Sequence, residues 1–127
     1  RDAGFSRKIG AVEWGYFTKA ERRLRETHPG LTCYIFSDDI EAVAAEYQPQ
    51  GAHEFVRSIE PTQGHEAIRL MSLCQHAIIS NSSFSWWGAW LINSSSKTVI
   101  APAPWFANPA NANPGPVLPT WIKLARN

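Results

Sequence analysis

The chain has 127 residues, a length typical of one domain with its own hydrophobic core. Apolar residues make up 44% and charged residues 18% of the sequence, which is ordinary for a folded globular protein. The formal net charge is only +1 and no block of Lys or Arg stands out, so neither nucleic acid nor a membrane surface is indicated as the main partner. We expect a single domain over residues 1–127.

Several common sites and signals are missing. The longest apolar stretch, Phe84 to Ile92, is far shorter than the ~20 residues that span a bilayer. Cys33 and Cys74 form no CxxC pair, and their apolar surroundings favour buried free thiols over a disulfide or a metal pair. The motifs HExxH, GxGxxG, GxxxxGK[ST] and GxSxG are absent. We therefore expect no metal site, and the composition is typical of a cytosolic protein.

The hydrophobic pattern predicts helices and strands that alternate along the chain. In order, we expect helix 14–27, strand 32–36, helix 40–47, strand 54–56, helix 65–74, strand 77–79, helix 84–91 and strand 98–100. The wholly apolar runs 77–79 and 98–100 are typical of strands buried on both faces of a parallel sheet. Alternation with short connections predicts an α/β fold with a doubly wound, Rossmann-like parallel sheet.

Two segments are expected to lie outside this regular pattern. Residues 1–15, whose last two overlap the start of the predicted helix 14–27, are interpreted as an interdomain segment. Residues 101–119 hold most of the chain's nine prolines. Because proline disfavours both a regular helix and a central strand, we expect an ordered but irregular segment there. Trp105, Phe106 and Trp121 are expected to hold this segment against the body of the domain.

The segment after strand 77–79 carries the strongest signal of a binding site. Small polar residues follow the strand, and a helix then begins; they are Asn81, Ser82, Ser83 and Ser85, with Phe84 among them. In open parallel sheets, ligands bind beyond the carboxyl ends of the strands. The first N–H groups of a helix have no intrahelical partner and lie at its positive end, so they can bind a phosphate without a metal. The alternative is that Asn81 or Ser82 only caps the helix.

A second polar cluster follows the predicted strand 32–36, and its members are Ser37, Asp38 and Asp39. The carboxylates could accept hydrogen bonds from ribose hydroxyls or from the N–H edge of a guanine, or they could only cap the next helix. Both clusters are predicted to lie at the same edge of the sheet. Glu66 opens the helix 65–74, near the loop after strand 54–56, from which it could reach a ligand.

The helix 84–91 is apolar nearly all round, which predicts burial either in the core or against a second domain. Its three tryptophans, Trp86, Trp87 and Trp90, are spaced for core packing, and the alternative is a platform on which a sugar stacks. Gly88 lies in the middle of this helix, where glycine is unfavourable by about 1 kcal/mol relative to alanine. We therefore expect the backbone of a neighbouring element to pack closely there.

Three segments, taken in order, resemble the carboxyl-terminal part of bacterial α-1,2-fucosyltransferases. They are Phe36–Glu41 (FSDDIE), Leu70–His76 (LMSLCQH) and Ile79–Leu91, followed by Val99–Pro102, Trp105-Phe106 and Trp121-Ile122. The run NSSFSWWGA at 81–89 is the most specific, whereas SDD alone would mean little. The resemblance covers nearly all of the chain from about Tyr16 onward.

This resemblance implies the donor-binding, carboxyl-terminal half of a two-domain transferase of the GT-B kind. Such enzymes bind GDP-L-fucose, invert its anomeric centre and form an α-1,2 link to a galactose-type acceptor without a metal. By the same analogy, Ser82, Ser83 and neighbouring amides hold the pyrophosphate. The implied location is the bacterial cytoplasm, with peripheral association of the full enzyme at the inner face of the membrane.

Two departures from the family pattern limit what this chain is expected to do alone. The family's HxRxGD segment, with its donor-binding arginine, is absent from this sequence, so the partner expected is an N-terminal domain that supplies it. Without that domain we expect no useful turnover, and no residue here is assigned as the catalytic base. Relatives usually carry Asp where this chain has Ala67, so either Glu66 replaces that contact or recognition of the purine is weakened. The alternatives are a GT-B domain for a different nucleotide sugar, or a carbohydrate-binding module that presents its tryptophans.

Overall fold

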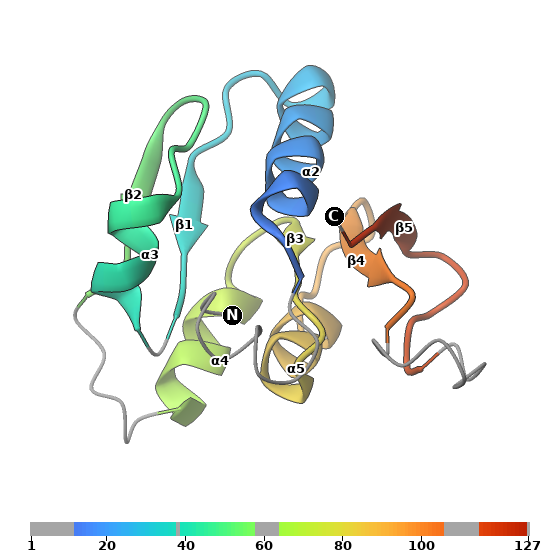
Figure 1. Cartoon of the computed structure of the whole chain (residues 1–127). Coiled ribbons are helices and arrows are strands. Elements are labelled where there is room, and N and C mark those ends of the chain that lie inside the picture. The colour runs from blue at the N-terminus through green and yellow to red at the C-terminus, as the bar shows by residue number, and fades with distance from the viewer. Residues whose placement is uncertain (1–11, 38, 58–63, 106–114, 127) are drawn as a thin grey trace.

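Helices and strands alternate along the chain, as the hydrophobic pattern predicts (Figure 1). The structure, a computed structural model, describes residues 12–37, 39–57, 64–105 and 115–126. The helices are α2 (Trp14–Thr27), α3 (Ile40–Glu46), α4 (Gly64–Ser72) and α5 (Ser83–Trp90). The strands are β1 (Cys33–Ile35), β2 (His53–Phe55), β3 (Ala77–Ile78), β4 (Val99–Ala103) and β5 (Ile122–Ala125). Each predicted helix and strand is therefore present within a few residues of its predicted bounds.

The strands form two parallel sheets rather than the one continuous doubly wound sheet that we predicted. One sheet pairs β1 with β2, and the other has the order β3-β4-β5. β1 has three residues and β3 only two, so a ladder between them would contain few hydrogen bonds. A cavity lies between these two strands instead. The fold is thus α/β with parallel strands, in two sheets.

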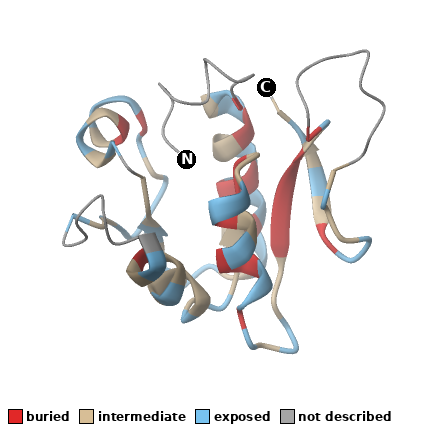
Figure 2. Cartoon of the chain, turned by 90° about the horizontal axis from the view of Figure 1, so that it is seen from below, coloured by how far each residue is buried: buried red, intermediate tan, exposed pale blue. Residues whose placement is uncertain are grey.

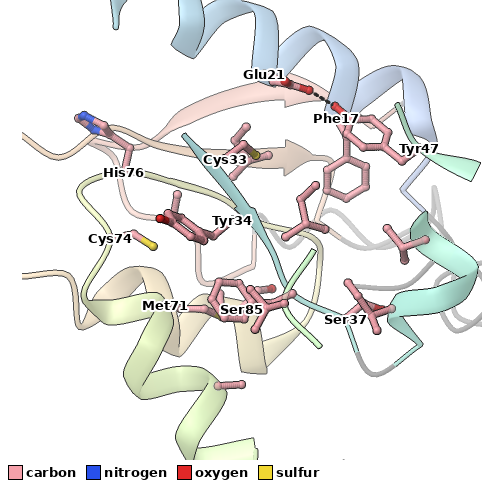
Figure 3. A pocket seen from close by; sticks show the side chains of 18 of the residues that line it. Phe17, Glu21, Cys33, Tyr34, Ser37, Tyr47, Met71, Cys74, His76 and Ser85 are labelled. Atoms are coloured by element: carbon pink, nitrogen blue, oxygen red, sulfur yellow. Dashed lines mark hydrogen bonds between the residues drawn. The ribbon is translucent and has the colours of Figure 1, made fainter. Parts of the chain in front are cut away.

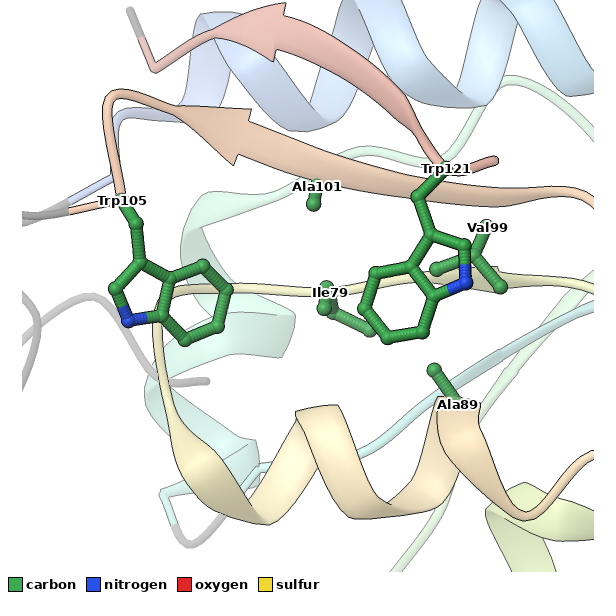
Figure 4. Packing of buried hydrophobic residues seen from close by; sticks show 6 residues of the cluster. All are labelled: Ile79, Ala89, Val99, Ala101, Trp105 and Trp121. Carbon is green, nitrogen blue, oxygen red and sulfur yellow. The ribbon is translucent and has the colours of Figure 1, made fainter. Parts of the chain in front are cut away.

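Helices cover both faces of the three-stranded sheet, and alternate residues of β4 contact them. Val99 and Ala101 pack with Ile79, Ala89, Trp105 and Trp121 on the α5 side (Figure 4). Ile100 points to the other face, where it packs with Tyr16 and Leu24 of α2. Buried residues accordingly concentrate along β4 and on the inward sides of the helices (Figure 2). This arrangement places the end of β3 inside a well-packed layer.

Helix α2 joins the two sheets. Its buried face, Tyr16, Ala20 and Leu24, has helical spacing and lies on the β3–β5 sheet. On the other side, the guanidinium of Arg25 donates to the carbonyls of Leu31 at 3.0 Å and of Ala52 at 2.9 Å, next to β1 and β2. The helix ends at Thr27, before the Pro29-Gly30 pair that predicts its end.

The expectation that no central strand occurs in 101–119 is wrong for its first residues. Pro102 lies within β4, and β4 is the middle strand of its sheet. β5 was not predicted, because its alternation of half-buried and exposed residues extends over only four positions. Trp105 and Trp121 are buried as expected, at 7% and 5% exposure. Phe106 lies in 106–114, outside the described residues.

The segment 1–15, predicted to connect domains, is described only from residue 12 onward. Val12 is 3% exposed and belongs to the core cluster around Tyr16, and Trp14 and Gly15 lie in α2. The described end of this segment is therefore part of the body of the domain. Residues 1–11 lie outside the described residues.

Candidate functional site

A cavity of about 1070 Å³ lies between the two sheets. Its walls come from α2, β1, α3, α4, β3 and the start of α5, and most of the side chains are apolar. Figure 3 shows Ser37 and Ser85 near the carboxyl ends of β1 and β3, with Cys74 and His76 on the side away from Ser37. A cavity of this size and shape is typical of a site for a small-molecule ligand.

The segments that follow three parallel strands border this cavity. Ser37 follows β1, Arg57 follows β2, and Ser82 and Ser83 follow β3. The sequence predicts that the clusters around Ser37 and Ser82 share one edge, and the structure places Ser37 and Ser82 themselves at the same cavity. Ligands of parallel α/β folds bind at this end of the strands. The cavity therefore has the position of a ligand site as well as the size.

The start of α5 combines capping with free donors. The Ser82 hydroxyl oxygen accepts from the N–H of Ser85 at 3.2 Å, so Ser82 is the N-cap, as the capping alternative predicts. The N–H of Trp86 donates to the Ser82 carbonyl at 3.1 Å. Within the described residues, the N–H groups of Ser83 and Phe84 have no acceptor. Capping thus leaves two amides at the cavity that can bind an anion.

A network of serine hydroxyls fixes the loop before α5. The Ser85 hydroxyl lies 2.8 Å from the Ser82 hydroxyl and 3.3 Å from that of Ser80. It also lies 3.2 Å from the Ser82 carbonyl and 3.4 Å from that of Ser80. Ser80 and Ser85 are only 1% and 6% exposed. Ser85 therefore holds the loop together, while Ser83 stays exposed beside the cavity.

The other predicted site residues form contacts within the chain, and one of them lies outside the described residues. Ser37 accepts from the N–H of Asp39 at 3.0 Å, and Asp39 occupies the N-cap position of α3 without a side-chain capping bond. Asp38 lies outside the described residues. Asn81 donates through Nδ2 to the Trp105 carbonyl at 3.4 Å and is not among the cavity-lining residues. Neither Asp39 nor Asn81 is among the described residues that line the cavity.

Ala67, rather than Glu66, lines the cavity. The carboxylate of Glu66 pairs with Arg69 at 2.6 Å, and this hydrogen bond lowers the pKa of Glu66 below its usual range. Neighbouring positions of a helix point about 100° apart, which accounts for the different directions of the two side chains. The cavity wall at position 67 therefore carries a methyl group, with no carboxylate from Glu66 in its place.

Arg57 is a cavity residue that the sequence analysis did not single out. Among the described residues that line the cavity, it alone is an Arg or Lys. It donates to Glu41 at 2.6 Å and 3.4 Å, and this hydrogen bond raises the pKa of Arg57. Both side chains are largely exposed, so the pair is weak and can be exchanged for another anion. Its position at the end of a strand, just after the predicted run 54–56, is the signal that could have identified it.

Helix α5 is only partly buried, in contrast to its apolar sequence. Trp86 packs on the core and donates through its ring N–H to the Pro116 carbonyl at 2.8 Å. Trp87 and Trp90 are 48% and 47% exposed. Gly88 is closely approached as expected, but by a side chain and not by a backbone: an added Cβ would lie 2.7 Å from the terminal carbon of Met71.

The cysteines and His76 have structural surroundings. Both thiols are free as expected, although they are half-buried rather than buried. Burial raises the pKa of Cys33 to about 11 and also raises that of Cys74, so neither is a ready nucleophile. His76 accepts the N–H of Thr98 at 2.9 Å through Nδ1, which gives it a structural role.

Two other kinds of feature, a metal cluster and a membrane-spanning helix, are absent from the described residues. No cluster of three or more His, Cys, Asp or Glu side chains there could hold a metal ion. None of the described helices has the length and apolarity needed to cross a membrane.

Comparison with known proteins identifies relatives for nearly the whole chain. The model of the family described as "Glycosyl transferase family 11" matches residues 5–125. The chain is 32% identical over 115 residues to the "O-antigen biosynthesis glycosyltransferase WbnK" of Escherichia coli, covering 91% of this chain and 37% of that protein. It is 35% identical over 113 residues to an "Alpha-1,2-colitosyltransferase" of Escherichia coli, covering 87% and 39%. No solved structure matches. The chain thus spans less than half the length of either relative.

Proposed function

The chain belongs to glycosyl transferase family 11, and from this premise we propose that its cavity binds the nucleotide-sugar donor of a glycosyl transfer reaction. We propose GDP-L-fucose as the donor and an inverting α-1,2 transfer to a galactose-containing acceptor as the reaction. In this proposal a further, N-terminal domain would supply the donor-binding arginine and the base. The proposed location is the bacterial cytoplasm, at the inner face of the membrane.

The observation that carries the proposal is the position of the α5 amino terminus. The N–H groups of Ser83 and Phe84 lie at the cavity, at the positive end of a helix that follows a parallel strand. Arg57 and Ser37 contribute a positive charge and a hydroxyl from the ends of two other strands. Two amides, a hydroxyl and an exchangeable guanidinium can together bind a diphosphate without a metal.

These groups also suit the charge that develops during transfer. As the acceptor oxygen attacks the anomeric carbon from the opposite face, the bond to the diphosphate breaks and negative charge accumulates on the departing oxygen. Fixed amides stabilise that charge without reorganising at the moment of reaction. In this proposal the chain binds the donor and stabilises the leaving group, and the proton of the acceptor hydroxyl goes to a base in the other domain.

The base of the nucleotide would be recognised less strongly than in relatives that carry Asp at position 67. Ala67 lies on the cavity wall and Glu66 is turned toward Arg69, so neither offers a carboxylate to a guanine edge. Asp39 remains a candidate, since it follows β1 beside Ser37. We propose that most of the donor affinity of this chain comes from the diphosphate.

The test is a calorimetric titration of GDP into the purified chain and two variants at one position. Ser83→Ala removes only a hydroxyl, whereas Ser83→Pro removes the hydroxyl and the N–H. Proline is favoured at the first position of a helix, and Ser82 already has the extended backbone, φ −117° and ψ 144°, that precedes proline. We expect a loss of about tenfold or more for Ser83→Pro, the equivalent of one charge-assisted hydrogen bond. Equal affinities for both variants would exclude the amide as a ligand.

A colitosyl donor is the second candidate, because one relative is named as an α-1,2-colitosyltransferase. Competition between GDP-fucose and GDP-colitose for the same cavity separates these two donors. The same titration with UDP and ADP tests the choice of base, and chelation of divalent cations tests independence from metal. Saturable binding of UDP but not GDP would reject both guanine-nucleotide donors.

A carbohydrate-binding module is the third candidate, and the exposure of Trp87 and Trp90 favours it. Free oligosaccharide would then protect their fluorescence from acrylamide while GDP has no effect. Protection by GDP alone would reject this candidate.

A further inference from the structure

A buried hydroxyl on helix α2 contacts the backbone just after β3. The Tyr16 hydroxyl oxygen lies 2.6 Å from the carbonyl oxygen of Ile79 and 3.0 Å from that of Ile100. All three residues are 0% exposed. A hydroxyl has one proton to donate, and the shorter distance assigns it to Ile79. Burial raises the pKa of Tyr16 well above its ordinary value, so the hydroxyl keeps this proton.

The ladder between β3 and β4 lacks a donor at this carbonyl. Ala77 pairs with Val99 and Ile78 with Ile100, so Ile79 lies next in register to Ala101. The N–H of Ile79 donates to Ile100 at 2.9 Å, as a parallel ladder requires. The same ladder would have the N–H of residue 102 donate to the carbonyl of Ile79. Residue 102 is proline and has no N–H.

The Tyr16 hydroxyl therefore stands where the missing amide of Pro102 would donate. A buried carbonyl without a donor is strongly unfavourable, and tyrosine removes that penalty from a distance of 63 residues in the sequence. The paired carbonyl belongs to the residue just before Ser80. Ser80 in turn contacts Ser85, and Ser85 contacts Ser82 at the start of α5.

We infer that Tyr16 is a positioning residue for the donor site: it fixes the carbonyl of Ile79 and thereby the loop 80–84 that presents the amides of Ser83 and Phe84. The inference rests on the proposed function for its effect on donor affinity. Its structural part, that Tyr16 replaces the amide absent at Pro102, is independent of any ligand.

Restoring the missing amide gives a direct test. Tyr16→Phe removes the hydroxyl and keeps the ring, and Pro102→Ala supplies an N–H at the position from which the ladder can donate. The wild type, both single variants and the double variant are compared by amide hydrogen exchange of residues 80–86 and by GDP titration. Tyr47→Phe serves as the control for the exchange measurement, because it removes another buried hydroxyl that contacts α2, through Glu21 and not through the carbonyl of Ile79.

For Tyr16→Phe we expect at least tenfold faster exchange of the loop amides and a GDP affinity lowered about tenfold. The double variant should recover most of both values, and any faster exchange in Tyr47→Phe should follow the loss of global stability and not be confined to the loop amides. If Tyr16→Phe does not fold, the double variant should fold, because the ladder bond is restored. Unchanged loop exchange in Tyr16→Phe, or a double variant no better than Tyr16→Phe, would overturn the inference. If the wild type binds no GDP, the proposed function fails while the exchange data still decide the role of Tyr16.

Discussion

The hydroxyl of Tyr47 donates a 2.6 Å hydrogen bond to Oε1 of Glu21, a carboxylate on α2 that is only 2% exposed. Oε2 of the same carboxylate accepts from Arg25 and from the backbone N–H of Gln50, both at 2.7 Å. Burial alone would raise the pKa of Glu21, but these three donors hold it below its ordinary value. The bonds from Tyr47 and Gln50 join α2 to the chain between α3 and β2, while the ion pair with Arg25 lies within α2.

Replacing Tyr47 with phenylalanine should destabilise the fold, because the buried carboxylate loses one of its donors. We expect the free energy of unfolding to fall by about 1.5–3 kcal/mol, the range for a hydrogen bond to a charged group. Urea denaturation measures it. Tyr34→Phe is the matched control, since Tyr34 is 50% exposed. Equal effects of the two variants would show that the bond to Glu21 contributes nothing of its own.

Replacing Arg57 with glutamine should lower the affinity for GDP about tenfold, because one charge-assisted contact to the diphosphate is lost. Arg69→Gln is the control: Arg69 also forms an exposed pair with a glutamate, but it is not among the cavity-lining residues. Calorimetric titration at low and high salt gives the comparison, and the difference should shrink at high salt. A similar loss for both variants would indicate a general charge effect.

Gly88→Ala should destabilise the protein although alanine is the better helix former by about 1 kcal/mol. The added Cβ would lie 3.0 Å from the Cβ of Met71, which cannot move without α4. We expect a net loss of about 1 kcal/mol in thermal denaturation, within the usual range for overpacking. In a Met71→Gly background, which removes that Cβ, the same substitution should instead be stabilising. A destabilisation that persists in that background would contradict this explanation.

Stability should fall as the pH is lowered through 6.5, partly because of His76. Burial, and then the charge of His28 stacked on it at 4.2 Å, lower the pKa of His76 from its ordinary value of 6.5. Below pH 6.5 the unfolded chain therefore binds more protons at this position than the folded chain, so protonation favours unfolding. Protonation of Nδ1 would also break the bond from the N–H of Thr98.

Chemical denaturation between pH 7.5 and pH 5.5 measures this dependence. His76→Asn keeps an acceptor near the position of Nδ1 without a titrating group. It should reduce the slope of the free energy of unfolding against pH. His65→Asn, which removes an imidazole from an exposed position, is the matched control. A slope identical in wild type and His76→Asn would assign the effect to other groups.

The sequence predicts those features that depend on neighbouring residues. Helix α2 begins and ends where its apolar spacing and the Pro29-Gly30 pair indicate. The polar residues from Asn81 to Ser85 are predicted to lie between a strand and a helix, as they do in the structure. This prediction succeeds because the hydrophobic patterns of the strand and of the helix depend only on neighbouring residues. The same local pattern is compatible both with capping by Ser82 and with anion binding beside it. In the structure Ser82 caps the helix through the N–H of Ser85, so the N–H of Ser83 is not used by the cap.

Features that depend on distant residues were missed. Pro102 is tolerated in a central strand because Tyr16, far away in the sequence, supplies the hydrogen bond. The separation of β1 from β3 depends on how whole elements pack, which no periodicity encodes. Arg57 reaches the cavity rim in contact with Glu41, 16 residues earlier, so its role is visible only in three dimensions.

Both walls of the cavity are tied to the same helix. Tyr16 holds the end of β3, while Glu21, five residues later, holds the segment between α3 and β2. At 1.5 Å per residue these two anchors are about 7.5 Å apart along α2. The width of the cavity mouth is therefore set by the geometry of one rigid helix, and any tilt of α2 moves the serine loop and the Ser37 side together.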